Sequence, residues 1–291
     1  MPLLTKDFLA RLAALEVIAR RIRRGRFRGE RRSTRKGSSV EFADHRPYAI
    51  GDDVRFLDWN MYARLDRLVV KLFHDEEDLA VHLVLDRSAS MDFGEPTKAL
   101  YAKRVLAAIG YIALLSMNRV ILWSPGEGED VDVRDLRSPG SAPRLFDALD
   151  AAPIGGDAGL GEPFRRWIGT RRPRGVIVVA SDFLHPDGAW SHLTPLARGG
   201  LEAHCVRVLT PDEETPTALG DLRLVDSETG GGVDVTVTPR LLALYRDART
   251  AYDRRLDEFC RSRQITLSTA NTSEPFETLV LESLRRKGLL G

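Results

Sequence analysis

Apolar residues gather along the chain in short runs separated by longer amphipathic or apolar segments, a pattern that predicts strands alternating with helices. The expected strands are residues 81–85, 118–123, 131–136, 175–180, 201–209 and 265–269. The expected helices are residues 97–117, 143–149, 162–170, 189–197, 239–261 and 274–287. Strands that alternate with helices favour a mostly parallel central sheet with helices on both faces, so the sequence predicts an α/β fold.

Other predicted elements stand outside this alternation. Apolar residues at three- and four-residue spacing predict a helix over residues 3–25, and a glycine-rich turn predicts an extra β-hairpin near residues 221–238. Residues 68–73 are expected to form an edge strand, antiparallel to residues 81–85 across the acidic turn 75–78. That turn is either a metal-binding loop or a solvated hairpin tip, and the second is the commoner use of such residues.

The chain divides into three expected parts: a basic N-terminal helix and linker at residues 1–36, an Arg/Asp-rich segment at 37–78, and an α/β domain at 79–291. Residues 1–36 carry twelve Lys or Arg against three Asp or Glu, a net charge of +9, whereas the whole chain carries +1. This segment suits an acidic protein face or anionic lipid, or it is a solvated helix. We do not expect a nucleic-acid partner, because Phe27 is the one aromatic residue interleaved with its basic run.

The clearest candidate chemistry follows the apolar run at residues 81–85. Asp86, Ser88 and Ser90 place one carboxylate and two hydroxyls within five residues, and Asp182 follows the second buried run at 175–180. Ligands of open α/β sheets bind beyond the carboxyl ends of the strands. Because oxygen ligands suit hard cations, the sequence predicts a site for Mg²⁺, with Mn²⁺ or Ca²⁺ as alternatives.

The spacing D-x-S-x-S resembles the metal-ion-dependent adhesion site of von Willebrand factor A domains. The resemblance implies that Asp86, Ser88 and Ser90 hold the ion, that Asp182 supports it, and that a Thr from a third loop completes the set. Asp157 stands where that Thr is expected. Asp157 is therefore either a further metal ligand or the N-cap of the helix that follows it.

Residues 37–78 are rich in arginine, aspartate and aromatic residues. Arginine–aspartate pairs can order an irregular loop in this segment, and Trp59 and Tyr62 could anchor the segment on the core. Its motifs are Arg46-Pro47-Tyr48, Gly51-Asp52-Asp53-Val54-Arg55, Asp58-Trp59, Ala63-Arg64 and Val70-Lys71-Leu72-Phe73. Together with the pentapeptide from Asp86 to Ser90, they resemble the bacterial domain-of-unknown-function family fifty-eight, whose members contain a von Willebrand factor A-like domain. The similarity runs from about residue 37 to residue 287.

This resemblance implies a partner. Members of the family are commonly associated with MoxR-type AAA+ ATPases, which implies an adaptor or chaperone-like role for this chain beside such an ATPase or its client protein. We therefore expect a metal-dependent protein-interaction module. The alternatives are a metal-dependent phosphoester hydrolase in the same crevice, and a structural interaction domain whose metal site is degenerate.

Features of several other function classes are missing from the sequence. It has no P-loop and no G-x-S-x-G elbow. His185 follows Asp182 closely, but a single histidine in a loop more often lies at the surface than in an active site. We therefore do not expect an enzyme. No apolar stretch is long enough to span a bilayer, and the N-terminus has no signal-peptide pattern. Cys205 and Cys260 have no metal-binding spacing, so we expect free thiols and a cytoplasmic protein.

Overall fold

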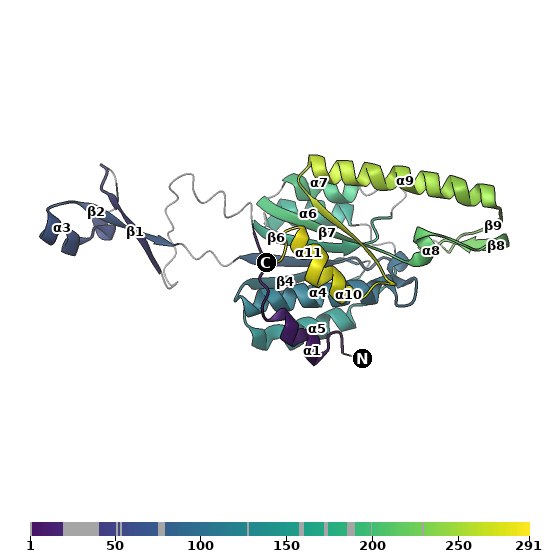
Figure 1. The fold of residues 1–291 in the computed structure, drawn as a ribbon, viewed down its shortest axis with the longest axis horizontal. Coiled ribbons are helices and arrows are strands. Elements are labelled where there is room, and N and C mark those ends of the chain that lie inside the picture. Colours follow the sequence, from purple (N-terminus) through teal and green to yellow (C-terminus); the bar gives the residue numbers. More distant parts are fainter. Residues whose placement is uncertain are drawn as a thin grey trace. The chain divides into compact units, whose positions relative to one another are not determined.

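The computed structural model describes residues 2–19, 41–50, 52, 54–74, 79–126, 128–156, 160–171, 174–184, 190–198, 200–228 and 230–291. The chain separates into two compact units (Figure 1). The main unit contains Met1–Gly25 and Leu79–Gly291, and the smaller unit contains Arg26–Asp78.

The main unit is built on a sheet that has six strands in the described part of the chain, in the order β10-β7-β6-β3-β4-β5. These strands are β3 Ala80–Leu85, β4 Arg119–Ser124, β5 Val131–Leu136, β6 Arg174–Ser181, β7 Gly200–Leu209 and β10 Thr266–Asn271. All neighbours pair in parallel except β5, which is antiparallel to β4 at the edge. The predicted α/β class with a mostly parallel central sheet is confirmed.

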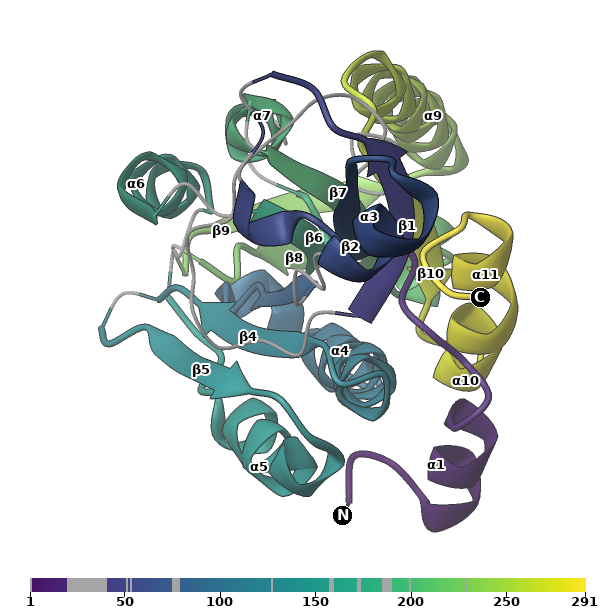
Figure 2. The same ribbon diagram turned by 90° about the vertical axis from the view of Figure 1, so that its left-hand side faces the viewer.

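Helices cover both faces of this sheet (Figure 2). On one face lie α1 Lys6–Leu12, α4 Lys98–Leu115, α5 Ala142–Ala151, α10 Phe276–Thr278, the π-helical turn η4 Leu279–Ser283 and α11 Leu284–Arg286. On the other lie α6 Gly161–Arg171, α7 Trp190–Arg198 and α9 Pro239–Ser262. Side chains alternate along β3, so Leu83 joins the core on the α4 face and Val84 joins the core on the α6 face.

The register between β3 and β6 brings the candidate residues together. Leu85 pairs with Ala180, so the residues that follow each strand leave the sheet at the same edge. The backbone N–H of Asp86 donates to the carbonyl of Ala180 at 3.0 Å, which continues the pairing one step past the end of β3. Helix α4 then returns along the sheet from this edge, with Thr97 as its N-cap.

The N-terminal helix is shorter than the pattern predicts. A helix over residues 3–25 was expected, but α1 ends at Leu12, and the chain then runs extended. Val17 forms an antiparallel bridge with Leu290, and the N–H of Ile18 donates to the carbonyl of Leu289 at 2.8 Å. This tertiary pairing outweighs helix periodicity, while the basic run at 20–36 lies outside the described residues.

The smaller unit pairs β1 Glu41–Pro47 with β2 Val69–His74 in an antiparallel ladder. The predicted strand at 68–73 exists, but its predicted partner is wrong. Both edges of β3 are already taken by the parallel strands β4 and β6, so β2 cannot pair there. The acidic turn 75–78 lies outside the described residues.

Ion pairs order the loop between these two strands, as the Arg/Asp pattern predicts. The guanidinium of Arg46 donates to both carboxylate oxygens of Asp52 at 2.7 Å, a bidentate pair. The unit also contains η1 Val54–Phe56 and α3 Trp59–Leu65. Trp59 and Tyr62 pack edge to face on each other within this unit, and the expectation that they anchor the segment on the core stays a prediction.

The remaining elements of the main unit include short helical turns and the extra hairpin. The turns are η2 Ala89–Asp92, η3 Pro139–Ser141 and α8 Pro211–Glu214, and the hairpin pairs β8 Gly220–Val225 with β9 Gly232–Val237. The predicted hairpin near 221–238 is confirmed. Among the described helices, none combines the length and apolarity needed to cross a bilayer.

Candidate functional site

The candidate site lies at the carboxyl ends of β3 and β6. Asp86 follows β3 directly, Ser181 is the last residue of β6, and Asp182 comes next. The hydroxyl of Ser181 donates to Oδ2 of Asp86 at 2.5 Å, and the N–H of Ser88 donates to Oδ1 of Asp86 at 2.9 Å. These two bonds fix the carboxylate plane of Asp86 against the loop that carries Ser88 and Ser90.

The environment of Asp86 disfavours its charge. The pKa of Asp86 is raised to about 6, mainly by burial and also by the nearby carboxylate of Asp182, and the hydrogen bonds from Ser181 and Ser88 oppose this shift only in part. A cation bound beside Asp86 would stabilise the anion that burial penalises.

The two serine hydroxyls share a hydrogen bond, and their separation also fits two ligands of one hard cation. Ser88 Oγ and Ser90 Oγ lie 3.0 Å apart. Two oxygens on adjacent corners of an octahedron, each about 2.1 Å from Mg²⁺, are about 3 Å apart. Beside a buried carboxylate, these hydroxyls therefore form a donor set that fits a small divalent ion.

Among the described residues, no group of three or more His, Cys, Asp or Glu side chains could hold a metal ion. The hydroxyls of Ser88 and Ser90 are the further oxygen donors that the described residues offer beside Asp86 and Asp182. Hydroxyl and carboxylate oxygens are ligands that Mg²⁺ accepts, and it keeps waters in the remaining positions.

The third predicted loop is tied to the same edge. The N–H of Gly155 donates to the carbonyl of Arg87 at 2.8 Å, and the N–H of Ala89 donates to the carbonyl of Gly156 at 3.0 Å. Gly155 and Gly156 both have positive φ, 147° and 81°, which favours glycine at each position. Asp157 itself lies outside the described residues, so its role as a ligand stays a prediction.

Asp182 is held by two donors. Its Oδ1 accepts the N–H of Leu184 at 2.9 Å, and its Oδ2 accepts the ammonium of Lys98 at 2.7 Å. Lys98 stands in the first turn of α4 and also forms an ion pair with Glu213 of α8. Asp182 is thus placed at the predicted site with part of its charge already neutralised. His185, the other candidate near this loop, lies outside the described residues.

Residues 44–255 match the family described as "Protein of unknown function DUF58", which is well over half of the chain. The chain belongs to this family. The family resemblance read from the sequence motifs is therefore confirmed.

Two mycobacterial proteins are similar in sequence to this DUF58 chain, and each matches the same share of it. The uncharacterized protein Rv1480 of Mycobacterium tuberculosis and the uncharacterized protein Mb1516 of Mycobacterium bovis are each 29% identical over 251 residues, spanning 84% of this chain and 78% of theirs. Neither name assigns an activity.

Solved structures also match this chain, at lower sequence identity. BatB, a conserved hypothetical protein of Bacteroides thetaiotaomicron, is 13% identical with a TM-score of 0.44, over 72% of this chain and 98% of that one. The VWA domain of SpRpn10 is 14% identical with a TM-score of 0.38, over 70% and 94%.

Sequence reasoning missed three residues of this DUF58 site: Arg87, Lys98 and Ser181. Arg87 donates from Nε to the carbonyl of Pro125 at 3.1 Å and from Nη2 to the carbonyl of Glu129 at 2.9 Å, so it fixes a neighbouring loop. One signal was available for Lys98, because a lysine at the start of a helix that is apolar almost all round needs a buried partner.

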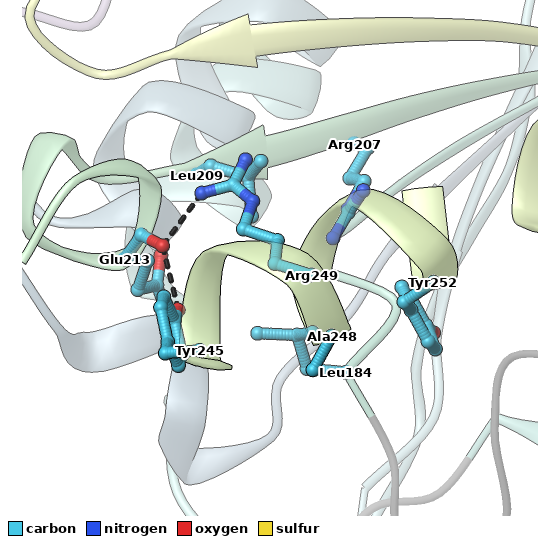
Figure 3. A pocket seen from close by; sticks show the side chains of 8 residues that line it. All are labelled: Leu184, Arg207, Leu209, Glu213, Tyr245, Ala248, Arg249 and Tyr252. Atoms are coloured by element: carbon cyan, nitrogen blue, oxygen red, sulfur yellow. Dashed lines mark hydrogen bonds between the residues drawn. The ribbon is translucent and has the colours of Figure 1, made fainter. Parts of the chain in front are cut away.

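A cavity of about 200 Å³ lies next to the site, beyond Asp182. Figure 3 shows its lining from the end of β7, α8 and α9. The lining residues are Leu184, Arg207, Leu209, Glu213, Tyr245, Ala248, Arg249 and Tyr252. Arg207 connects the two features, because its Nε donates to the carbonyl of Asp182 at 3.2 Å while its Nη1 pairs with Asp253.

Proposed function

We propose that this chain is a metal-dependent protein-interaction module. Asp86, Ser88 and Ser90 bind Mg²⁺, or Mn²⁺ or Ca²⁺ in its place, and Asp182 supports the ion directly or through water. Asp157 is a further candidate ligand, with the N-cap of the following helix as its alternative role. The observation that carries this proposal is the 3.0 Å spacing of the two serine hydroxyls beside a buried carboxylate whose charge is poorly compensated.

An open coordination position on the ion favours an acidic partner group. A divalent ion adds two positive charges to a cluster in which the ammonium of Lys98 pairs with the carboxylates of Asp182 and Glu213. Together with the carboxylate of Asp86, these charges and that of the ion sum to zero. A carboxylate from another protein would therefore be attracted by the ion itself, at the position that the protein leaves open.

The partner we propose is a MoxR-type AAA+ ATPase or its client protein, with this chain acting as an adaptor or chaperone-like component in the cytoplasm. The support for this partner is the family resemblance carried by the motifs of residues 37–78. These residues would offer a second contact surface. The site is proposed to bind rather than to catalyse.

The test is binding of the purified MoxR-type ATPase from the same cell, with Mg²⁺ and with EDTA. Wild-type protein should bind in Mg²⁺ and lose at least tenfold in affinity in EDTA, because the ion links the two proteins. Asp86→Ala should bind weakly in both conditions. Asp221→Ala, a change in the exposed β8–β9 hairpin, is the matched control and should behave as wild type.

Equal binding of wild-type protein in Mg²⁺ and EDTA would contradict the proposal. A second assay separates binding from catalysis. Turnover of a phosphoester by the purified protein with Mg²⁺ or Mn²⁺, lost in Asp182→Ala, would favour a hydrolase instead.

A further inference from the structure

Lys98 is the most completely buried charged side chain beside the proposed metal site. It is 1% exposed, and its ammonium donates to Asp182 Oδ2 at 2.7 Å and to Glu213 Oε1. A buried ammonium needs such partners, because an uncompensated charge in the interior is costly. Lys98 therefore already occupies, as a cation, one oxygen of a carboxylate that the divalent ion is proposed to use.

Glu213 is held rigidly on the far side of Lys98. Its carboxylate closes a capping box with Thr210 at the start of α8, and its backbone carbonyl accepts from Tyr245 Oη and from Arg249 Nη1, each at 2.6 Å (Figure 3). These bonds fix where Glu213 meets the ammonium. Lys98 is thus shared between a carboxylate at the metal site and one outside it.

We propose that Lys98 is a resident cation that competes with the divalent ion for Asp182 and thereby weakens Mg²⁺ binding. This inference rests on the proposed metal site and adds the residue that sets its affinity. The ammonium and the metal ion repel each other while sharing one carboxylate, so Mg²⁺ binds less tightly than the oxygen ligands alone would allow. Glu213 moderates this effect, because it attracts the ammonium away from Asp182.

Two substitutions should shift Mg²⁺ affinity in opposite directions. Lys98→Met removes the competing charge and should tighten Mg²⁺ binding by roughly tenfold. Glu213→Gln leaves Lys98 with Asp182 as its charged partner and should weaken binding by about threefold. Glutamine is accepted at the third position of a capping box, so Glu213→Gln keeps the local fold.

The chain provides a matched control in the same helix. Lys103 is also buried in α4, but its ammonium donates to the backbone carbonyls of Asp150 and Ala152, at 3.0 and 2.9 Å. Lys103→Met removes a buried ammonium of the same kind that donates to none of the proposed metal ligands. It should lower stability and leave Mg²⁺ affinity unchanged.

The experiment is a calorimetric titration of Mg²⁺ into the full-length chain, in wild type and in these three variants, with folding checked by circular dichroism. Tighter binding in Lys98→Met and weaker binding in Glu213→Gln would support the proposal. If Mg²⁺ binds to wild type but the two variants match it, Lys98 is a structural ion pair and the proposal is overturned. Should Lys98→Met fail to fold, unchanged affinity in Glu213→Gln overturns it alone.

A different result would remove the metal site itself. If neither wild type nor folded Lys98→Met binds Mg²⁺ at millimolar concentration, the proposed function fails, and the role of Lys98 fails with it. The two failures are thus distinguished by whether wild-type protein binds the ion.

Discussion

At the scale of single residues, the burial of polar groups shapes this protein as much as its apolar core does. Asp86, Lys98 and Asp182 are each buried at one end of the sheet, and each has a charged or hydroxyl partner. His82 is a different case, in the middle of β3. Its Nε2 bonds the carbonyl of Arg174 at 3.1 Å, and its ring packs edge to face on Trp167.

We expect the protonation of His82 to lower the free energy of unfolding in acid. Burial lowers the pKa of His82 to about 4, and the positive charge of Arg119 contributes, whereas the hydrogen bond to Arg174 opposes the shift. The unfolded chain therefore binds more protons than the folded chain between about pH 6.5 and pH 4. Stability should be fully present above pH 6.5 and fall as the pH drops through this window, by at most about 3 kcal/mol.

The measurement is urea unfolding of wild type and His82→Gln from pH 7.5 to pH 4. Glutamine does not titrate but can still donate to the carbonyl of Arg174. The difference in unfolding free energy between the two proteins should shift in favour of the variant as the pH falls. A difference that stays constant with pH would show that His82 is not the titrating group.

At the scale of elements, close approach of β3 and β6 sets the site, and Gly175 makes this approach possible. Gly175 has φ of +121°, and a Cβ atom placed on it would lie 2.0 Å from the carbonyl oxygen of Ala80. No side chain fits there without separating the two strands. The register that places Asp86 beside Ser181 therefore begins with a glycine at the other end of β6.

Gly175→Ala should destabilise the protein by about 2–4 kcal/mol, through backbone strain and steric overlap. Two other glycines serve as controls in the same urea unfolding series. Gly128→Ala, with no atom near its added Cβ, should change stability by less than about 0.5 kcal/mol. Gly169→Ala, in an exposed position of α6, should stabilise by about 0.5–1 kcal/mol. Equal effects at all three positions would contradict this account.

The sequence predicted most elements of the main unit well because its strands are short apolar or alternating runs and its helices are longer segments that are amphipathic or apolar throughout. Val81 to Leu85 and Val131 to Leu136 needed no tertiary information. The N-terminal helix and the pairing of residues 68–73 failed for one reason: long-range strand contacts with Leu290 and with β1 decided them. Local periodicity carries no signal for such partners.

The candidate site was predictable in part, for a related reason. Asp86 and Asp182 could be found because polar residues after buried strands meet at one sheet edge. The contact of Lys98 with Asp182 spans 84 positions, and the contact of Ser181 with Asp86 spans 95. No spacing rule in a single sequence reports contacts of that range.

At the scale of the whole molecule, both described hydrophobic cores lie within the main unit, and so do all the described candidate ligands. Phe8 of α1 packs on Phe276 at a centroid distance of 5.2 Å, which ties the N-terminal segment to the C-terminal helices. The main unit is therefore discontinuous in sequence, with residues 26–78 inserted between its two parts.

We expect the main unit to fold without residues 26–78. The variant that tests this replaces them with a glycine-serine linker long enough to join residue 25 to residue 79. Because the described ligands all belong to that unit, its Mg²⁺ affinity should stay within about twofold of wild type. Calorimetry and thermal unfolding measure both properties. Loss of Mg²⁺ binding in a folded deletion variant would show that the smaller unit completes the site.

The metal site is tested most directly by the anomalous scattering of a crystal of this chain grown in excess Mn²⁺. We expect a manganese peak about 2.2 Å from Ser88 Oγ and Ser90 Oγ, within reach of Asp86 directly or through one water. If the loop that carries Ser88 and Ser90 is ordered in this crystal and no manganese peak lies beside the two hydroxyls, the proposed metal site is contradicted.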